Sequence, residues 1–268
     1  MLPTLFSIGG LDVPTHAFCL TLGILTATLV MVYEARRRGR LDQELVAVMA
    51  GTLLFGAVGA KLATVWQYVR LSPDPTLFGA LVDGGKSILG GLAGAYVGAL
   101  ITKKIVGYQG KTGDLFAPGI ALGMAVGRVG CFLTEQIGTP TSLPWGISVD
   151  AATAARLPGG MEAGVPMHPS FLYEIAFQLL IFAVLWALRD RVPVPGELFK
   201  IYLVTYGSFR FLVEFVRGNE VMWSGLSGSQ LFLIPSTLLL LAYFYRQISR
   251  GAYRSGPAPS LSPAGEPA

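Results

Sequence analysis

The sequence predicts an all-α, polytopic membrane protein with seven transmembrane helices, its N-terminus outside and its C-terminus in the cytoplasm. Of its 268 residues, 52% are hydrophobic and only 13% are charged, whereas soluble domains carry about 25% charged residues. Apolar stretches recur along the chain, and each is close in length to the roughly 20 residues that a helix needs to cross a hydrocarbon core. Basic residues follow alternate stretches, and the positive-inside rule assigns those segments to the cytoplasm.

Seven stretches are long and apolar enough to be transmembrane spans, and together they predict one membrane domain over residues 1–250. The start of the chain lacks a basic segment, so we expect no cleavable signal peptide. The tail, 251–268, is rich in Pro, Ser, Gly and Ala, and we expect it to be disordered in the cytoplasm. The predicted spans are residues 14–33, 44–68, 86–102, 114–133, 169–188, 196–216 and 229–246.

Charge and cysteine content exclude several classes of function. The net charge of +4 does not indicate a nucleic-acid partner, because the basic residues lie mainly in short segments between apolar spans and in the tail. Cys19 and Cys131 lack metal-ligand spacing. The glycines of residues 84–91 lack the spacing and the preceding strand of a phosphate-binding loop. We therefore expect no metal, nucleotide or redox cofactor.

The fourth span carries the most informative stretch of the chain. Gly119, Gly123 and Gly127 recur every fourth residue, a spacing that lets another helix approach closely. Arg128 and then Glu135 follow near the end of this span. A charged residue at membrane depth usually faces a polar cavity and marks function. The alternative is that Arg128 extends to the lipid headgroups and does no chemistry.

The sixth span carries a polar stripe on an otherwise apolar helix. Tyr206, Arg210, Glu214 and Arg217 recur at helical spacing, and Arg210 with Glu214 forms an i,i+4 pair. One interpretation is a structural ion pair that fixes helix packing. The other is an anion site completed by Arg128, because arginine binds phosphate through two parallel hydrogen bonds. Such a site suits a phospholipid headgroup.

Other polar residues give weaker signals. His168 opens the fifth span and is either a proton carrier or a loop contact. Glu174 is either a buried partner of an arginine or a structural residue. Cys131 is either a thiol activated by a nearby cation or a small buried side chain. His16 is expected to make a polar contact within the helix bundle.

Four motifs in this order resemble those of bacterial prolipoprotein diacylglyceryl transferases. The resemblance extends from about residue 10 to residue 246, and the motifs of the fourth and sixth spans are specific in combination. The motifs are residues 90–92 (GGL), 127–132 (GRVGCF), 168–174 (HPSFLYE) and 206–215 (YGSFRFLVEF).

The resemblance implies an inner-membrane enzyme that moves the diacylglyceryl group of phosphatidylglycerol to the lipobox cysteine of a prolipoprotein. It implies that Arg128 binds the lipid phosphate and that Arg210 stabilises the departing charge. Phosphatidylglycerol, the prolipoprotein signal peptide and membrane lipid would be the partners. The catalytic residues carried over are Arg210, Glu135, His168, Tyr206 and Glu214, and the substrate-binding residues are Arg128, Gly90, Gly91 and Arg217.

The chain departs from the family pattern at several positions. Leu89 stands where the family has a histidine, Cys131 replaces an asparagine, and His16 takes the place of a tyrosine in the first span. The segment from Arg128 to Glu135 is one residue shorter than usual. Two alternatives follow: a glycerophospholipid transferase with another acceptor, or a non-catalytic protein that binds or moves lipid.

Overall fold

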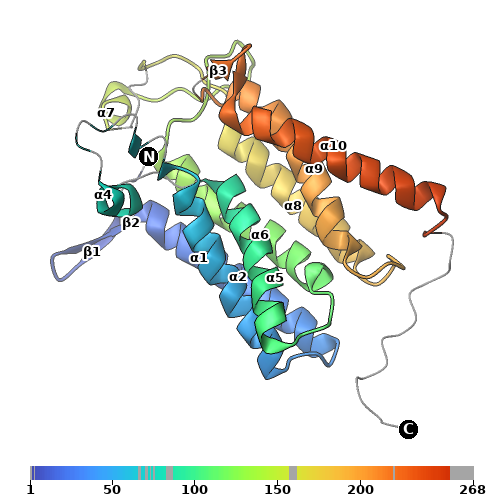
Figure 1. Cartoon of the computed structure of the whole chain (residues 1–268). Coiled ribbons are helices and arrows are strands. Elements are labelled where there is room, and N and C mark those ends of the chain that lie inside the picture. The colour runs from blue at the N-terminus through green and yellow to red at the C-terminus, as the bar shows by residue number, and fades with distance from the viewer. Residues whose placement is uncertain are drawn as a thin grey trace, which may run out of the picture. The chain divides into compact units, whose positions relative to one another are not determined.

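A computed structural model gives the fold of the described part of the chain (Figure 1). Residues 254–268 of the predicted tail lie outside it, as do the loop charges at positions 70, 83, 86 and 220 that contributed to the predicted orientation. The described residues are 2, 4–65, 68–69, 72, 74, 76–82, 87–156, 162–219 and 221–253.

The chain forms two compact units, one of residues Met1–Ala35 with Lys111–Ala268 and one of residues Arg36–Gly110. In the second unit, α2 (Gln43–Leu62) and α5 (Ile88–Val106) pack side by side, and α4 (Leu77–Val82) is a short helix between them in sequence. A Cβ atom on Gly59 would lie 2.5 Å from the Gly90 carbonyl oxygen and 2.8 Å from the Gly94 Cα. Glycine therefore brings these two backbones into direct contact.

The first unit begins with a hairpin that precedes the first predicted span. Strands β1 (Thr4–Ile8) and β2 (Leu11–Pro14) pair antiparallel. Gly9 and Gly10 connect them with φ of 58° and 84°. Two consecutive positive φ values define the tight turn that matches strand twist, and glycine adopts them without strain.

Helix α6 (Gly113–Thr134) is the most buried of the long apolar helices, and it packs against α8 (Ser170–Leu188) and α9 (Glu197–Val213). Gly23 of α1 (Thr15–Arg37) meets the backbone of Gly123 and Gly127 on another face of α6. Helices α1, α8 and α9, which contribute polar side chains to the region described below, are thus all in contact with α6.

Helix α9 continues into a single 3₁₀ turn, η1 (Glu214–Val216), and then into the hairpin of β3 (Val221–Trp223) and β4 (Leu226–Ser227). Helix α10 (Gly228–Ser249) follows and packs along α9 (Figure 1). Helix α7 (Ala151–Ala154) is a short helix in the loop between α6 and α8.

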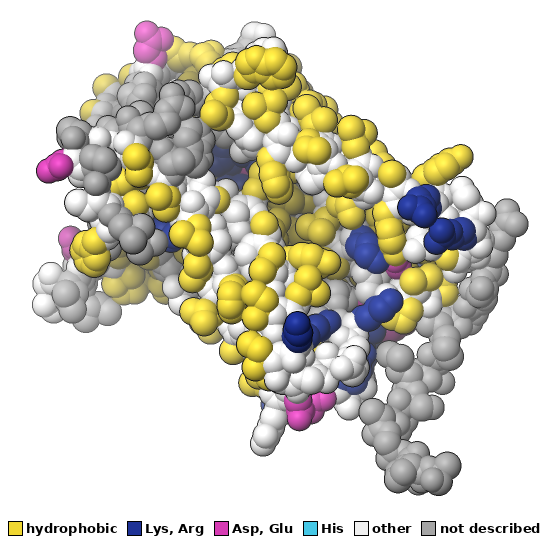
Figure 2. All heavy atoms as spheres, viewed as in Figure 1, with side chains coloured by type: hydrophobic (Ala, Val, Ile, Leu, Met, Phe, Trp, Pro, Cys, Tyr) yellow, Lys and Arg dark blue, Asp and Glu magenta, His cyan; other side chains and the backbone are white. Residues whose placement is uncertain are grey.

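Apolar side chains cover the outward surface of the last helix. On α10, the exposed residues include Phe232, Leu238, Leu239 and Ile248, and Figure 2 shows apolar side chains along this helix with basic ones gathered toward its end. A long apolar face that is exposed within the described part of the chain suits contact with lipid tails.

Six helices in the described part of the chain are long and apolar enough to cross a membrane: α1, α2, α5, α6, α8 and α10. They coincide with six of the seven predicted spans. Helix α9, in the remaining predicted span 196–216, has 17 residues. The number of seven spans therefore stays a prediction. Helix α2 ends at Leu62 rather than near residue 68 as predicted.

Candidate functional site

A group of charged side chains in the first unit centres on Glu174. Helix α8 carries this glutamate, which is fully buried and forms an ion pair with the buried Arg128 of α6. Its other oxygen, Oε1, accepts a hydrogen bond of 2.6 Å from Arg217 Nη1 just after η1. A buried carboxylate that holds two guanidinium groups satisfies the condition under which charges persist inside proteins.

Phe171 lies one turn before Glu174 and supports both arginines. The Cζ atoms of Arg128 and Arg217 lie 5.6 Å and 4.6 Å from the centre of its ring, within the range of a cation–π contact. Burial lowers the pKa of Arg217, and the positive charge of Arg128 lowers it further. The site therefore holds two cationic groups at close quarters, with the carboxylate of Glu174 between them.

A second ion pair confirms the predicted i,i+4 partnership. Arg210 and Glu214 are both buried and form a direct pair. Glu214 Oε1 also accepts hydrogen bonds of 2.8 Å from Asn219 Nδ2 and 2.6 Å from Ser227 Oγ. Ser227 is the N-cap of α10, so the same hydroxyl fixes both the helix start and the glutamate.

Two further buried donor groups, one on Arg128 and one on Tyr206, lie beside these pairs and interact with each other. The Tyr206 hydroxyl lies near the charges of Arg128, Glu174 and Arg210. Among the described residues, this hydroxyl and Arg128 Nε are buried without a hydrogen-bond partner of ordinary geometry. Buried donors usually have partners, so a ligand that accepts hydrogen bonds, such as a phosphate oxygen, fits here.

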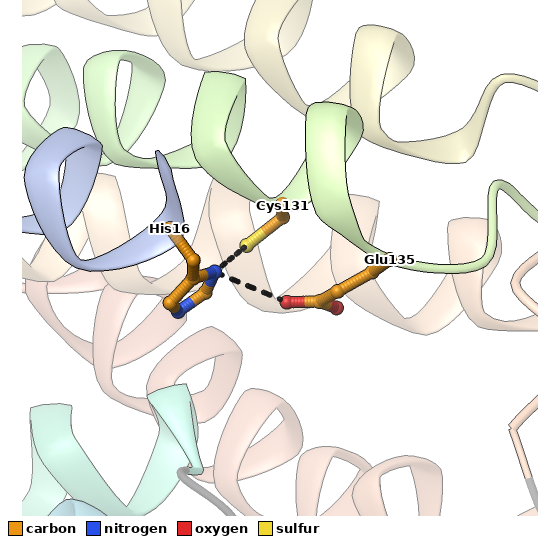
Figure 3. Close-up of side chains that lie close together, drawn as sticks. All are labelled: His16, Cys131 and Glu135. Atoms are coloured by element: carbon orange, nitrogen blue, oxygen red, sulfur yellow. Dashed lines mark hydrogen bonds and ion pairs between the residues drawn. The ribbon is translucent and has the colours of Figure 1, made fainter. Parts of the chain in front are cut away.

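Glu135 connects this network to a second cluster (Figure 3). Its Oε2 lies 3.8 Å from Arg217 Nη2, and its Oε1 lies 3.5 Å from His16 Nδ1. The same His16 nitrogen lies 3.9 Å from the sulfur of Cys131. Potential ligand atoms of His16, Cys131 and Glu135 all lie within 4.8 Å of one another, so these side chains could hold a metal ion. Sequence spacing gave no sign of this cluster, because His16 comes from α1 and the other two from the end of α6.

The remaining predicted site residues lie elsewhere. The His168 ring contacts the Tyr173 hydroxyl at 3.2 Å, and that hydroxyl also accepts a 2.7 Å hydrogen bond from Trp145 Nε1. Gly90 and Gly91 belong to the second unit, where they face the backbone and alanine side chains of α2. The contacts of these two glycines therefore show a role in helix packing.

Sequence reasoning missed Phe171, Asn219 and Ser227. Phe171 was hidden because an aromatic residue in an apolar helix gives no sign that it supports cations. Ser227 could have been found, since a serine with a glutamine three residues later, here Gln230, is the signature of a capping box.

The fold and the site define a class: a polytopic membrane protein with a buried arginine–glutamate network suited to an anionic headgroup. Residues 3–246 match the family model described as prolipoprotein diacylglyceryl transferase. The chain therefore belongs to the prolipoprotein diacylglyceryl transferase family.

Three relatives named phosphatidylglycerol–prolipoprotein diacylglyceryl transferase illustrate the similarity. The protein of Finegoldia magna is 32% identical over 252 residues, which cover 89% of this chain and 94% of the relative. That of Geobacter sulfurreducens is 33% identical over 250 residues, which cover 88% of this chain and 92% of the relative. That of Pasteurella multocida is 30% identical over 262 residues, which cover 90% of this chain and 92% of the relative.

Proposed function

We propose that this protein transfers the diacylglyceryl group of phosphatidylglycerol to the lipobox cysteine thiol of a prolipoprotein. The observation that carries this proposal is a network of three arginines in which two buried donors, Arg128 Nε and the Tyr206 hydroxyl, lack a hydrogen-bond partner of ordinary geometry. Family membership supports the reaction, and the donors support a phosphate-bearing substrate.

In the proposed reaction, the acceptor sulfur forms a bond to the terminal glyceryl carbon of the diacylglyceryl group. The bond from that carbon to the phosphate oxygen breaks, its electron pair stays on the oxygen, and glycerol phosphate leaves. The thiol proton is lost, with His16, His168 and Glu135 as candidate acceptors. Arg128 binds the phosphate and Arg210 stabilises the charge that develops on it, because donors fixed in a site with little water stabilise such charge strongly.

Glu135, Tyr206 and Glu214 take ordering roles in this proposal. Glu214 holds Arg210 in place through a direct ion pair, and its own position is fixed by Ser227 and Asn219. Arg217 adds positive charge beside the phosphate. Gly90 and Gly91 are carried over from the family resemblance as substrate-binding residues.

The proposal includes seven spans in the bacterial inner membrane, with the N-terminus outside and the C-terminus in the cytoplasm. Basic residues in the last turns of α1, α5 and α10 support this orientation. The ends of α6 and α9 that carry Arg128 and Arg210 would then lie on the outer side, where a secreted precursor presents its cysteine.

Arginine variants test the proposed function. Because removing one fixed donor to a developing charge costs about 100- to 1,000-fold in rate, Arg128→Ala and Arg210→Ala should each lower lipidation of a prolipoprotein by at least about 100-fold. Arg246→Ala is the control, since this arginine lies exposed in the last turn of α10. Full activity in both variants at normal abundance would contradict the proposal.

A second candidate function rests on Leu89, which occupies the position of the family histidine. Without that group the protein could bind or move phospholipid without consuming it. Turnover of phosphatidylglycerol by the purified protein would exclude this alternative. Turnover that leaves a lipobox peptide unmodified would instead indicate a different acceptor.

A further inference from the structure

The cluster of His16, Cys131 and Glu135 has the composition of a transition-metal site. Imidazole nitrogen, thiolate sulfur and carboxylate oxygen are the ligands that zinc takes in proteins. Cys131 is buried, whereas the side chains of His16 and Glu135 are 34% and 38% exposed. The cluster is thus anchored inside the protein and open on one side, with all three side chains directed toward one another (Figure 3).

The distances within the cluster are close to those between ligands of one metal ion. His16 Nδ1 lies 3.5 Å from Glu135 Oε1 and 3.9 Å from Cys131 Sγ. Hydrogen bonds between nitrogen and oxygen are about 2.7–3.2 Å long, so the contact between His16 and Glu135 is longer than usual. Ligand atoms about 2.0–2.3 Å from a tetrahedral zinc ion stand about 3.3–3.6 Å apart. Small side-chain movements would therefore bring the three atoms to metal-ligand positions.

The charges around the cluster are compatible with a divalent cation. Arg128 Nη1 lies 3.8 Å from Cys131 Sγ, and Arg217 Nη2 lies 3.8 Å from Glu135 Oε2. Both arginines are already paired with the buried Glu174. Glu135 meets Arg217 through Oε2 and leaves Oε1 directed toward His16. Thiolate and carboxylate together balance the two charges of the ion.

We propose that His16, Cys131 and Glu135 bind a zinc-class divalent ion whose open fourth position takes the thiol of the acceptor cysteine. The second half of this inference rests on the proposed function. Three protein ligands and one open position are typical of catalytic zinc, and a thiol that coordinates such an ion loses its proton.

The ion would replace a general base in the transfer step. With the ion held by His16, Cys131 and Glu135, the acceptor thiol would pass its proton to water, and its sulfur would attack the glyceryl carbon. The carbon–oxygen bond to phosphate breaks, and glycerol phosphate leaves with the electron pair. Contact between Cys131 and Arg128 would place the nucleophile beside the residue assigned to the leaving phosphate.

Cobalt(II) is a spectroscopic probe for this site, because a cobalt–thiolate bond gives a charge-transfer absorption band. The full-length protein, purified in detergent and freed of metal, should show this band on titration with cobalt. Cys131→Ser should abolish the band and weaken binding by more than the roughly 10- to 100-fold that loss of an outer-shell partner costs. Cys19→Ser is the matched control, since Cys19 is the chain's other buried free cysteine and lies outside the cluster.

His16→Tyr, which introduces the residue expected from the family pattern, should weaken cobalt binding to a similar extent. Absence of the band in the unaltered protein, or its retention in Cys131→Ser, would overturn the metal site. Neither result depends on enzymatic activity, so the proposed transferase function is tested separately from the metal site.

A peptide titration tests the open position. A lipobox peptide with cysteine should roughly double the charge-transfer intensity of the cobalt-loaded protein, because a second thiolate joins the first. The same peptide with serine should leave it unchanged. An unchanged band with the cysteine peptide would overturn the assignment of the fourth position to the acceptor.

Discussion

At the scale of single residues, Glu174 holds the site together. It contributes one carboxylate to two arginines that come from different parts of the chain, Arg128 on α6 and Arg217 after η1. Removing one partner from a buried ion pair is much more costly than removing a surface charge, because the remaining charge stays buried without compensation. The stability of this region should therefore depend on Glu174.

Glu174→Gln should destabilise the protein by about 3–5 kcal/mol, because the change leaves the buried Arg128 and the partly buried Arg217 without this carboxylate. Equilibrium unfolding in mixed micelles measures this effect. Glu162→Gln is the control, since this glutamate is exposed in the loop before α8. Equal stability of the two variants would show that Glu174 does not hold the arginines.

Ser227→Ala should cost about 1–2 kcal/mol, because it removes the N-cap of α10 and one hydrogen bond to Glu214. Ser236→Ala provides the comparison. The hydroxyl of Ser236 bonds only to carbonyls of its own helix, at Phe232 and Leu233. The same unfolding experiment should find this second variant close to the unaltered protein.

The sequence supported residue-level predictions only where partners share one helix. Arg210 and Glu214 are four residues apart, so helical geometry alone predicted their pairing. Glu174 was expected to pair with an arginine, but two partners could not be foreseen because they come from α6 and the segment after η1. His16 and Cys131 are 115 positions apart, and only packing of α1 against α6 brings them together.

At the scale of elements, glycines determine how closely α1 and α6 approach. A Cβ atom on Gly123 would lie 2.6 Å from the Gly23 carbonyl oxygen and 2.8 Å from the Ala27 Cβ, so the helices would have to move apart. At Gly127, one turn later, an added Cβ would meet no atom within 4 Å. Gly119, Gly123 and Gly127 therefore differ in how much space is left for a side chain.

Gly123→Ala should destabilise the protein by about 1–3 kcal/mol through overpacking. Gly127→Ala should be neutral or stabilising by up to about 1 kcal/mol, because alanine favours the helix and finds open space. Thermal unfolding of the two variants in the same detergent compares them directly. Equal destabilisation would contradict the close approach of α1 at Gly123.

Long apolar elements were predictable and short irregular ones were not. Six predicted spans coincide with long apolar helices, because a membrane span needs a long uninterrupted run of apolar residues. The N-terminal hairpin was missed although Gly9-Gly10 is a recognised turn signal, since its strands are only five and four residues long. Helix α9 ends three residues early because the chain tightens into η1.

At the scale of the whole molecule, the number of spans decides on which side each terminus lies. Seven spans put the two termini on opposite sides, whereas the six helices found by length and composition alone would put them on the same side. Orientation also decides whether the Arg128 region faces the side on which secreted precursors appear. Topology is therefore part of the functional proposal.

Single-cysteine labelling tests the orientation. In a background that lacks Cys19 and Cys131, a membrane-impermeant maleimide should label Ala152→Cys in intact spheroplasts, because this loop position is predicted to lie outside. Arg250→Cys, after α10, should be labelled only after the membrane is opened. Labelling of both positions in intact cells would contradict an odd number of spans.

The most direct test of the central claim is mass spectrometry of a lipobox peptide incubated with the purified protein and labelled phosphatidylglycerol. We expect the peptide to gain the mass of one diacylglyceryl group on its cysteine, with release of glycerol phosphate. An unmodified peptide and intact lipid, under conditions in which a relative of established activity modifies the same peptide, would contradict the transferase function.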